Sequence, residues 1–248
     1  RINLVSDSLG NLGAGKSFWA LLQYSNSEYT IFCDQDDIWF EQKLQNLYTF
    51  AEQKLNKNQI GFVYCDAHPY SDELGVITSK SISHLNANKL KDLMFLNAGF
   101  PGCSTLFNKP LLELAKNYTP DFYLHDDIIS LIGITFGNCV FLPKSLMLYR
   151  QHANQVTGNT KRTRFDRART FINRKKTVVS KAHYDEKVNF YAFYQNRMNK
   201  EQRKIFNSFF LFVNSGIIKR IGIIIQRKFT LGGSMMILIL KTLIRRPI

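Results

Sequence analysis

The residues best suited to chemistry form an acidic cluster directly after a short apolar segment. Tyr29–Cys33 reads YTIFC, and Asp34-Gln35-Asp36-Asp37 follows it at once. Open α/β sheets bind ligands at the carboxyl ends of their strands, which is where we expect these carboxylates to lie. Carboxylate oxygens one residue apart suit a divalent cation that also contacts phosphate oxygens. The alternative is a solvated turn with Asp37 near a helix start, although three acids in four positions repel one another.

A second motif, Gly10–Ser17, satisfies the G-x-x-x-x-G-K-[ST] pattern of phosphate-binding loops. In such a loop the backbone N–H groups and Lys16 would bind phosphates, and Asp34 would hold magnesium. The interval between Lys16 and Asp34 is short for the helix, turn and return strand that this fold requires. A P-loop NTPase is therefore kept as an alternative, and a coincidental turn and helix start is preferred.

A third group, His125-Asp126-Asp127, comes just before the apolar segment Ile128–Phe136. A carboxylate at this point can accept the proton of an attacking hydroxyl. Acids are also favoured at helix starts, where they cap free N–H groups. Both interpretations stay open from the residues alone.

Four blocks make the sequence recognisable. Tyr29–Trp39 (YTIFCDQDDIW) resembles the signature of bacterial family-2 glycosyltransferases of the rhamnosyltransferase-like group, and Phe100–Asn108 (FPGCSTLFN) resembles their glycine loop. His125-Asp126-Asp127 resembles their acceptor-site acid, and Leu146–Gly158 (LMLYRQHANQVTG) resembles the Tyr-Arg-Gln-His segment that follows it. The resemblance covers residues 3–158. It implies that Gly10–Ser17 is the loop and helix start before the metal-binding strand.

The resemblance implies an α/β domain of the GT-A nucleotide-sugar type, with a mixed, mostly parallel sheet flanked by helices. Members of the group begin with a strand, an Asn-Gly turn and a later Asp-Asp-Gly-Ser segment that contacts the nucleotide base. The sequence starts at Arg1 without them, and Asp127 replaces the usual aromatic residue after the acceptor-site acid. We therefore expect a glycosyltransferase that lacks its first strands and whose own activity is not assured.

The same resemblance implies how the donor would be bound. Asp36 would hold Mg²⁺ or Mn²⁺ on the diphosphate of a nucleotide-sugar donor, and Asp34 would contact the ribose or support the metal. Asp37 would be an outer partner of the metal or a helix cap, and His152 would contact the metal or the diphosphate. Further donor contacts are expected at Gly102, Cys103 and Arg150. The Arg150 guanidinium would pair with a phosphate or brace the sheet through a carboxylate.

For the reaction, the resemblance implies Asp126 as the general base of a single in-line displacement that inverts the anomeric centre. Asp127 is the competing candidate. The acceptor would be a hydroxyl of a glycan or of a polyprenyl-linked oligosaccharide in cell-surface polysaccharide synthesis. The expected location is cytoplasmic, peripheral on the inner face of the plasma membrane.

The net charge of +14 is unevenly distributed along the chain. Residues 1–160 hold 12 Lys and Arg against 15 Asp and Glu, whereas residues 161–248 hold 21 against 4. This predicts a core at 1–160 and a basic, amphipathic helical region at 161–248. Such charge points to a polyanion, either an anionic membrane or nucleic acid. Because no nucleic-acid-binding motif is recognised, we expect the membrane and keep a basic nucleic-acid-binding protein as an alternative.

The elements that must position these residues follow from the hydrophobic pattern. Strands are predicted at Tyr29–Cys33, Ile60–Cys65 and Cys103–Asn108. An amphipathic helix is predicted at Phe40–Leu55 and an apolar helix at Ile128–Phe136. Strands that alternate with helices indicate a layered α/β domain. The four cysteines form no C-x-x-C pair, which favours reduced thiols over a zinc site or a disulfide framework.

Overall fold

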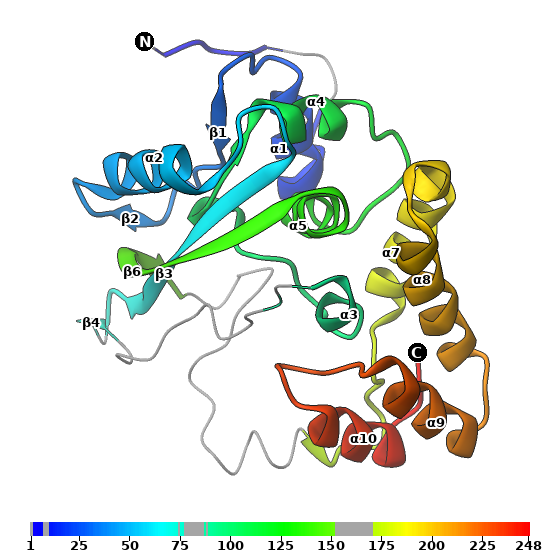
Figure 1. Ribbon diagram of the computed structural model, residues 1–248. Coiled ribbons are helices and arrows are strands. Elements are labelled where there is room, and N and C mark those ends of the chain that lie inside the picture. Colours follow the sequence, from blue (N-terminus) through cyan, green and yellow to red (C-terminus); the bar gives the residue numbers. More distant parts are fainter. Residues whose placement is uncertain (1, 7–9, 74, 77–86, 88, 152–170) are drawn as a thin grey trace.

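The computed structural model describes residues 2–6, 10–73, 75–76, 87, 89–151 and 171–248. Its strands form one mixed sheet in the order β1-β5-β3-β6-β2, with β4 paired to β3 (Figure 1). The strands are β1 (Tyr29–Ile31), β2 (Ile38–Trp39), β3 (Gly61–Ser71), β4 (Gly75–Val76), β5 (Thr105–Asn108) and β6 (Asn138–Arg150).

Helices cover both faces of this sheet, as the side-chain alternation along β3 requires. Phe62 and Tyr64 face the main hydrophobic core with α1 (Gly13–Leu22), α4 (Lys109–Lys116) and α5 (His125–Phe136). Val63 and Cys65 face the opposite way and pack with α2 (Lys43–Lys54). The expected α/β architecture, a mixed sheet flanked by helices, is confirmed.

The expectation of a mostly parallel sheet is wrong for the described strands. Only β3 and β6 pair in parallel, and the pairs β1–β5, β3–β5, β2–β6 and β3–β4 are antiparallel. The physical reason is that β5 lies between β1 and β3, which run in the same direction, and opposes both. Whether two paired strands are parallel or antiparallel depends on which strands become neighbours in the sheet, and the hydrophobic pattern of the sequence does not contain that information.

The remaining helices pack beside the sheet domain rather than apart from it. They are α3 (Leu90–Leu93), α7 (Lys181–Tyr194), α8 (Lys200–Val213), α9 (Ile217–Arg227) and α10 (Met235–Ile244), and short 3₁₀ turns occur at η1 (Gly102–Ser104) and η2 (Gln195–Arg197). The ring of Phe95 is fully buried against Phe209, Phe212 and Phe229. One hydrophobic cluster therefore continues from the sheet into the helical region.

Candidate active site

The acidic turn lies where β1 ends and β2 begins, and it packs on η1. Ligand atoms of Asp34, Asp37 and Cys103 all lie within 4.8 Å of one another. Asp36 does not belong to this group. Among the described residues, the structure thus brings Asp37 rather than Asp36 next to Asp34.

The electrostatics of the turn show a crowded pair of carboxylates. Burial raises the pKa of Asp34, and the charge of Asp37 raises it further. Burial likewise raises the pKa of Asp37, with a hydrogen bond from Cys103 opposing the increase at both residues. The pKa of the Cys103 thiol is raised well above its ordinary value, mainly by burial. The thiol therefore stays protonated and can donate to the two acids.

These residues fit a hard divalent cation through their carboxylates. Raised pKa values mean that the charges of Asp34 and Asp37 lack full compensation within the protein, and a cation would supply it. Carboxylate oxygens are the ligands that Mg²⁺ and Mn²⁺ prefer. Cys103 fits poorly as a ligand, because metal binding requires the thiolate.

Sequence reasoning missed Lys43, a fully buried cation beneath the turn. Its Nζ donates to the carbonyl oxygen of Cys103 at 2.6 Å and lies 3.7 Å from the centre of the Trp39 ring. Burial lowers the pKa of Lys43, while the charge of Asp37 opposes this shift. A signal was present in the sequence, because Lys43 precedes the buried Leu47 and Ala51 at four-residue intervals on one helix face.

Arg150 braces the acidic turn. Its backbone N–H donates to Asp37 Oδ1 at 3.1 Å, its Nε donates to the carbonyl oxygen of Asp36 at 2.7 Å, and its Nη1 pairs with Asp72. Arg150 thus pairs with a carboxylate, and its expected contact with a phosphate stays a prediction. His152, expected as a metal or diphosphate contact, lies outside the described residues.

Gly102 forms the contact between the acidic turn and the start of α5. A Cβ at this position would stand 2.9 Å from His125 Nε2 and 3.5 Å from Asp126 Cβ. The His125 ring packs against Phe18 and Phe32, and burial lowers its pKa to about 4. His125 is therefore neutral near pH 7 and forms an apolar wall.

Asp126 lies in the first turn of α5, at the side facing this contact. Its Oδ1 accepts a hydrogen bond from the backbone N–H of Asp127 at 3.1 Å. Burial raises the pKa of Asp126 well above its ordinary value, and the charges of Asp127 and Asp34 add to the increase. Asp34, predicted as a donor contact, thus adds to the raised pKa of the predicted general base.

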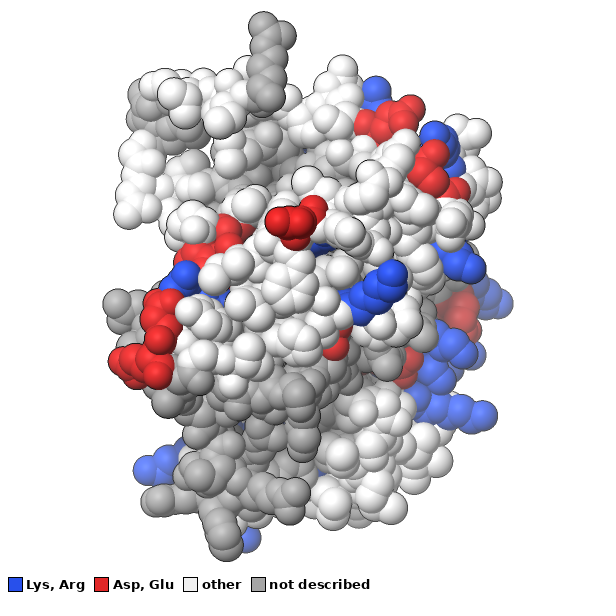
Figure 2. All heavy atoms as spheres, turned by 90° about the vertical axis from the view of Figure 1, so that its left-hand side faces the viewer, with Lys and Arg blue, Asp and Glu red and all other residues white. Residues whose placement is uncertain are grey.

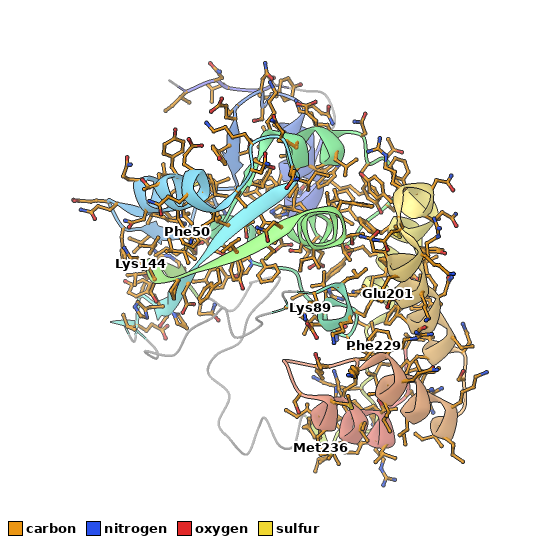
Figure 3. All side chains as sticks on the ribbon, in the orientation of Figure 1. Phe50, Lys89, Lys144, Glu201, Phe229 and Met236 are labelled. Carbon is orange, nitrogen blue, oxygen red and sulfur yellow. The ribbon has the colours of Figure 1, made fainter. Side chains whose placement is uncertain are left out.

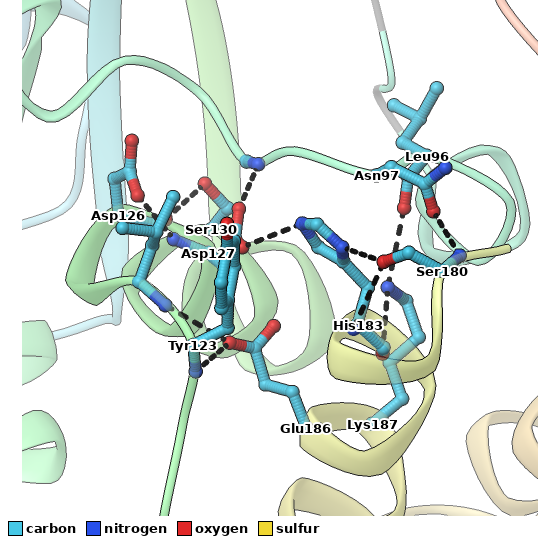
Figure 4. A network of polar contacts seen from close by, with 12 residues as sticks. Leu96, Asn97, Tyr123, Asp126, Asp127, Ser130, Ser180, His183, Glu186 and Lys187 are labelled. Carbon is cyan, nitrogen blue, oxygen red and sulfur yellow. Dashed lines mark hydrogen bonds and ion pairs between the residues drawn. The ribbon is translucent and has the colours of Figure 1, made fainter. Parts of the chain in front are cut away.

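The Asp127 side chain points away from Gly102 and toward α7. It is buried, its Oδ1 accepts a hydrogen bond from the Gly99 N–H, and its Oδ2 lies 3.2 Å from His183 Nε2. Figure 4 shows its carboxylate turned toward α7, with that of Asp126 on the other side of the helix start. Of the two candidates for the general base, the geometry favours Asp126.

The P-loop alternative receives no support from the described residues. Residues 2–6 form no strand, and α1 begins at Gly13. Lys16 is exposed and its Nζ lies 3.4 Å from Asp121 Oδ1, on the outside of the domain.

Comparison with known proteins gives one curated relative. The chain is 29% identical over 160 residues to the dTDP-rhamnosyl transferase RfbG of Shigella flexneri, a match that covers 59% of this chain. The chain spans about half (52%) of the length of that relative. A solved structure of residues 1–349 of TarS from S. aureus, in complex with UDP-GlcNAc, matches 58% of this chain and 40% of that one, with 15% identity and a TM-score of 0.39. No family model matches. The resemblance to rhamnosyltransferase-like glycosyltransferases is confirmed by the curated relative.

Proposed function

We propose that this chain, which is related to rhamnosyltransferase-like glycosyltransferases, carries the catalytic residues of an inverting glycosyltransferase. The donor is a nucleotide sugar, and the acceptor is a hydroxyl of a glycan or lipid-linked oligosaccharide in cell-surface polysaccharide synthesis. The observation that carries the proposal is the position of Asp126 beside Gly102 in η1, whose next residue, Cys103, lies against Asp34 and Asp37.

The proposed reaction is a single in-line displacement. Asp126 accepts the proton of the acceptor hydroxyl while the hydroxyl oxygen forms its bond to the anomeric carbon. The bond between that carbon and the diphosphate breaks on the opposite side, and its electron pair leaves with the diphosphate. Mg²⁺ or Mn²⁺, held by Asp34 and Asp37, would supply neutralisation of the departing charge.

Several neighbours prepare Asp126 for this role. A carboxylate whose pKa is raised toward the working pH is a stronger base than an exposed one. The neutral His125 and the adjacent aromatic rings keep the base partly desolvated. Gly102 lets the backbone of η1 approach His125 and Asp126 closely, because a Cβ at this position would stand 2.9 Å from His125 Nε2.

The test is Asp126→Asn, with Asp121→Asn as the matched control, since Asp121 is an exposed acid just before the same helix. We expect turnover with a panel of nucleotide sugars to fall about 10²–10⁴-fold in Asp126→Asn. Donor binding, measured by calorimetry, should stay within a few-fold. Normal turnover in Asp126→Asn would remove Asp126 from the mechanism.

We also propose an anionic membrane surface as a partner of α9 and α10. Exposed apolar side chains include Ile218 (85% exposed) on α9 and Met236 (63% exposed) on α10, next to the exposed cation Lys219. Figure 3 places Met236 at the end of the molecule away from the sheet. Figure 2 shows both acidic and basic side chains on the face that lies to the left in Figure 1. Apolar residues flanked by Lys and Arg suit the interface of an anionic bilayer.

In the described part of the chain, no helix is both long and apolar enough to cross a bilayer. The proposed contact is therefore peripheral. Ile218→Asp with Met236→Asp should reduce flotation with anionic vesicles at low salt, and Tyr24→Asp, an exposed site on the other side of the fold, should not. Equal recovery of all variants with neutral and anionic vesicles would contradict a membrane surface, and salt-sensitive binding to duplex DNA alone would favour the nucleic-acid alternative.

A further inference from the structure

Four ionisable side chains are buried together between α5 and α7, outside the donor site. The four residues are between 2% and 6% exposed: Asp127, His183, Glu186 and Lys187. Figure 4 shows Asp127 in contact with His183 and Lys187 in contact with the backbone of His183, while Glu186 contacts the backbone before α5. Burying so many charges costs free energy unless each is paired, so the arrangement calls for a reason beyond packing.

Glu186 caps the start of α5 from another helix. Its Oε2 accepts hydrogen bonds from the backbone N–H groups of Tyr123 at 2.9 Å and Leu124 at 3.4 Å. Leu124 is the residue at the N-terminal boundary of α5, and its own side chain cannot cap the helix. The N–H of Leu124 has no partner within α5, and that of Tyr123 precedes the helix. A residue 62 positions away in the chain supplies the acceptor.

The second set of contacts fixes the loop above the same turn. Asp127 Oδ1 accepts from the Gly99 N–H, and Ser130 Oγ accepts from the Phe100 N–H at 2.8 Å. Asp127 Oδ2 faces His183 Nε2, while His183 Nδ1 contacts Ser180 Oγ at the start of α7. The loop, the first turn of α5 and the first turns of α7 are therefore held as one unit.

Asp126 lies inside this unit. Its carboxylate accepts from the Asp127 N–H at 3.1 Å, so its direction depends on the helical geometry of the first turn of α5. We propose, on the basis of the proposed function, that α7 holds the Asp126 carboxylate in its reactive position, with Glu186 and His183 as positioning residues. Glu186 acts through the start of α5, and His183 acts through Asp127.

The electrostatics fit a permanent contact. Burial raises the pKa of Glu186 to about 8, and the charge of Asp127 adds to this, while Lys187 opposes it. Lys187 Nζ donates to the carbonyl oxygens of Leu96 and His183. With a pKa of about 8, Glu186 is mostly protonated near pH 7, so its Oε2 accepts from the Tyr123 and Leu124 N–H groups as part of a neutral carboxyl group. Through these two hydrogen bonds α7 contacts the start of α5 directly.

The experiment compares Glu186→Ala and Glu186→Gln with Asp185→Asn. Asp185 is the neighbouring acid on α7, but its side chain is half-exposed and pairs only with Lys181 in the contacts described. We expect Glu186→Ala to lower kcat about 10- to 100-fold, because misplacing a reacting group by about 1 Å can cost 10²-fold. The donor Kd should stay within about threefold. Glu186→Gln keeps an acceptor oxygen for Tyr123 and Leu124, so it should recover most of kcat.

A second variant, His183→Ala, leaves the Glu186 cap in place and should also lower kcat without changing the donor Kd. A readout independent of activity is the pKa of Asp126, measured by carbon-13 NMR of its labelled carboxyl group. Fraying of α5 would admit water, so this pKa should fall toward its ordinary value in Glu186→Ala and stay unchanged in Asp185→Asn.

The outcomes are distinguishable. Absence of sugar transfer by every variant and by the wild type would remove the proposed function, while the Asp126 pKa would still test the positioning. Wild-type kcat and an unchanged Asp126 pKa in both Glu186→Ala and His183→Ala would overturn the inference. Glu186→Gln is the fallback if Glu186→Ala does not fold. A folded Glu186→Gln protein whose kcat falls as far as that of His183→Ala would overturn the positioning role of the Glu186 hydrogen bonds.

Discussion

Replacing Gly99 by alanine tests the packing that surrounds the proposed base. An added Cβ would stand 2.6 Å from the carbonyl oxygen of Asp126, 2.6 Å from Ser130 Oγ and 2.8 Å from the Cα of Asp127. Two of these three atoms belong to the backbone of α5, so the neighbours cannot yield by rotating a side chain. The Gly99 loop must move away from the helix, and the N–H group that it donates to Asp127 must move with it.

The magnitude follows from the cost of overpacking, which is typically about 1–3 kcal/mol. The ratio of folded to unfolded protein should therefore fall about 5- to 150-fold. The matched control is Gly222→Ala within α9, where a Cβ would meet nothing within 4 Å. Alanine is favoured over glycine inside a helix by about 0.5–1 kcal/mol, so this control should be more stable than the wild type.

The assay is urea unfolding followed by circular dichroism, with turnover measured on the same samples. We expect the free energy of unfolding to decrease in Gly99→Ala and to increase in Gly222→Ala. Turnover should fall in the first variant and not in the second. A Gly99→Ala protein with unchanged stability and turnover would refute the tight contact between this loop and α5.

Three further predictions follow from individual contacts. Phe95→Ala should lower the free energy of unfolding by about 3–5 kcal/mol, since the Phe95 ring is fully buried among three other rings. In the same urea experiment Phe193→Ala should lower it clearly less, because the Phe193 ring is partly exposed. The pKa of Glu186 is about 8 in the folded chain and about 4.5 when exposed, so the folded state binds more protons between these pH values. The urea midpoint should therefore fall from pH 5 to pH 8. Glu186→Gln, which cannot titrate, should make this fall smaller. Asp37→Asn should weaken Mn²⁺ binding, followed by electron paramagnetic resonance, about tenfold or more, and Asp36→Asn should weaken it less; the reverse order would restore Asp36 as the ligand.

The sequence by itself determined the chemistry-bearing segments and their local setting. Alternating strand and helix patterns are short-range signals, and they correctly predicted strands before the acidic turn and within Cys103–Asn108, and helices at α2 and α5. The helix at α5 begins at His125, three residues before the apolar segment that predicted it, which places Asp126 and Asp127 in its first turn. The resemblance found in four blocks agrees with the curated relative.

Tertiary structure alone decided which side chains lie in contact at the site. Asp36 and Asp37 are adjacent in sequence, yet the direction of each carboxylate depends on the turn packing against Cys103 and on the brace from Arg150, 113 positions from Asp37. Lys43 reaches the carbonyl of Cys103 across 60 positions, and Glu186 reaches Tyr123 across 63. Such partners share no local pattern, because they meet only when the sheet and helices pack. Helix geometry turns the adjacent Asp126 and Asp127 about 100° apart, but only the packed fold brings Gly99 and His183 to Asp127.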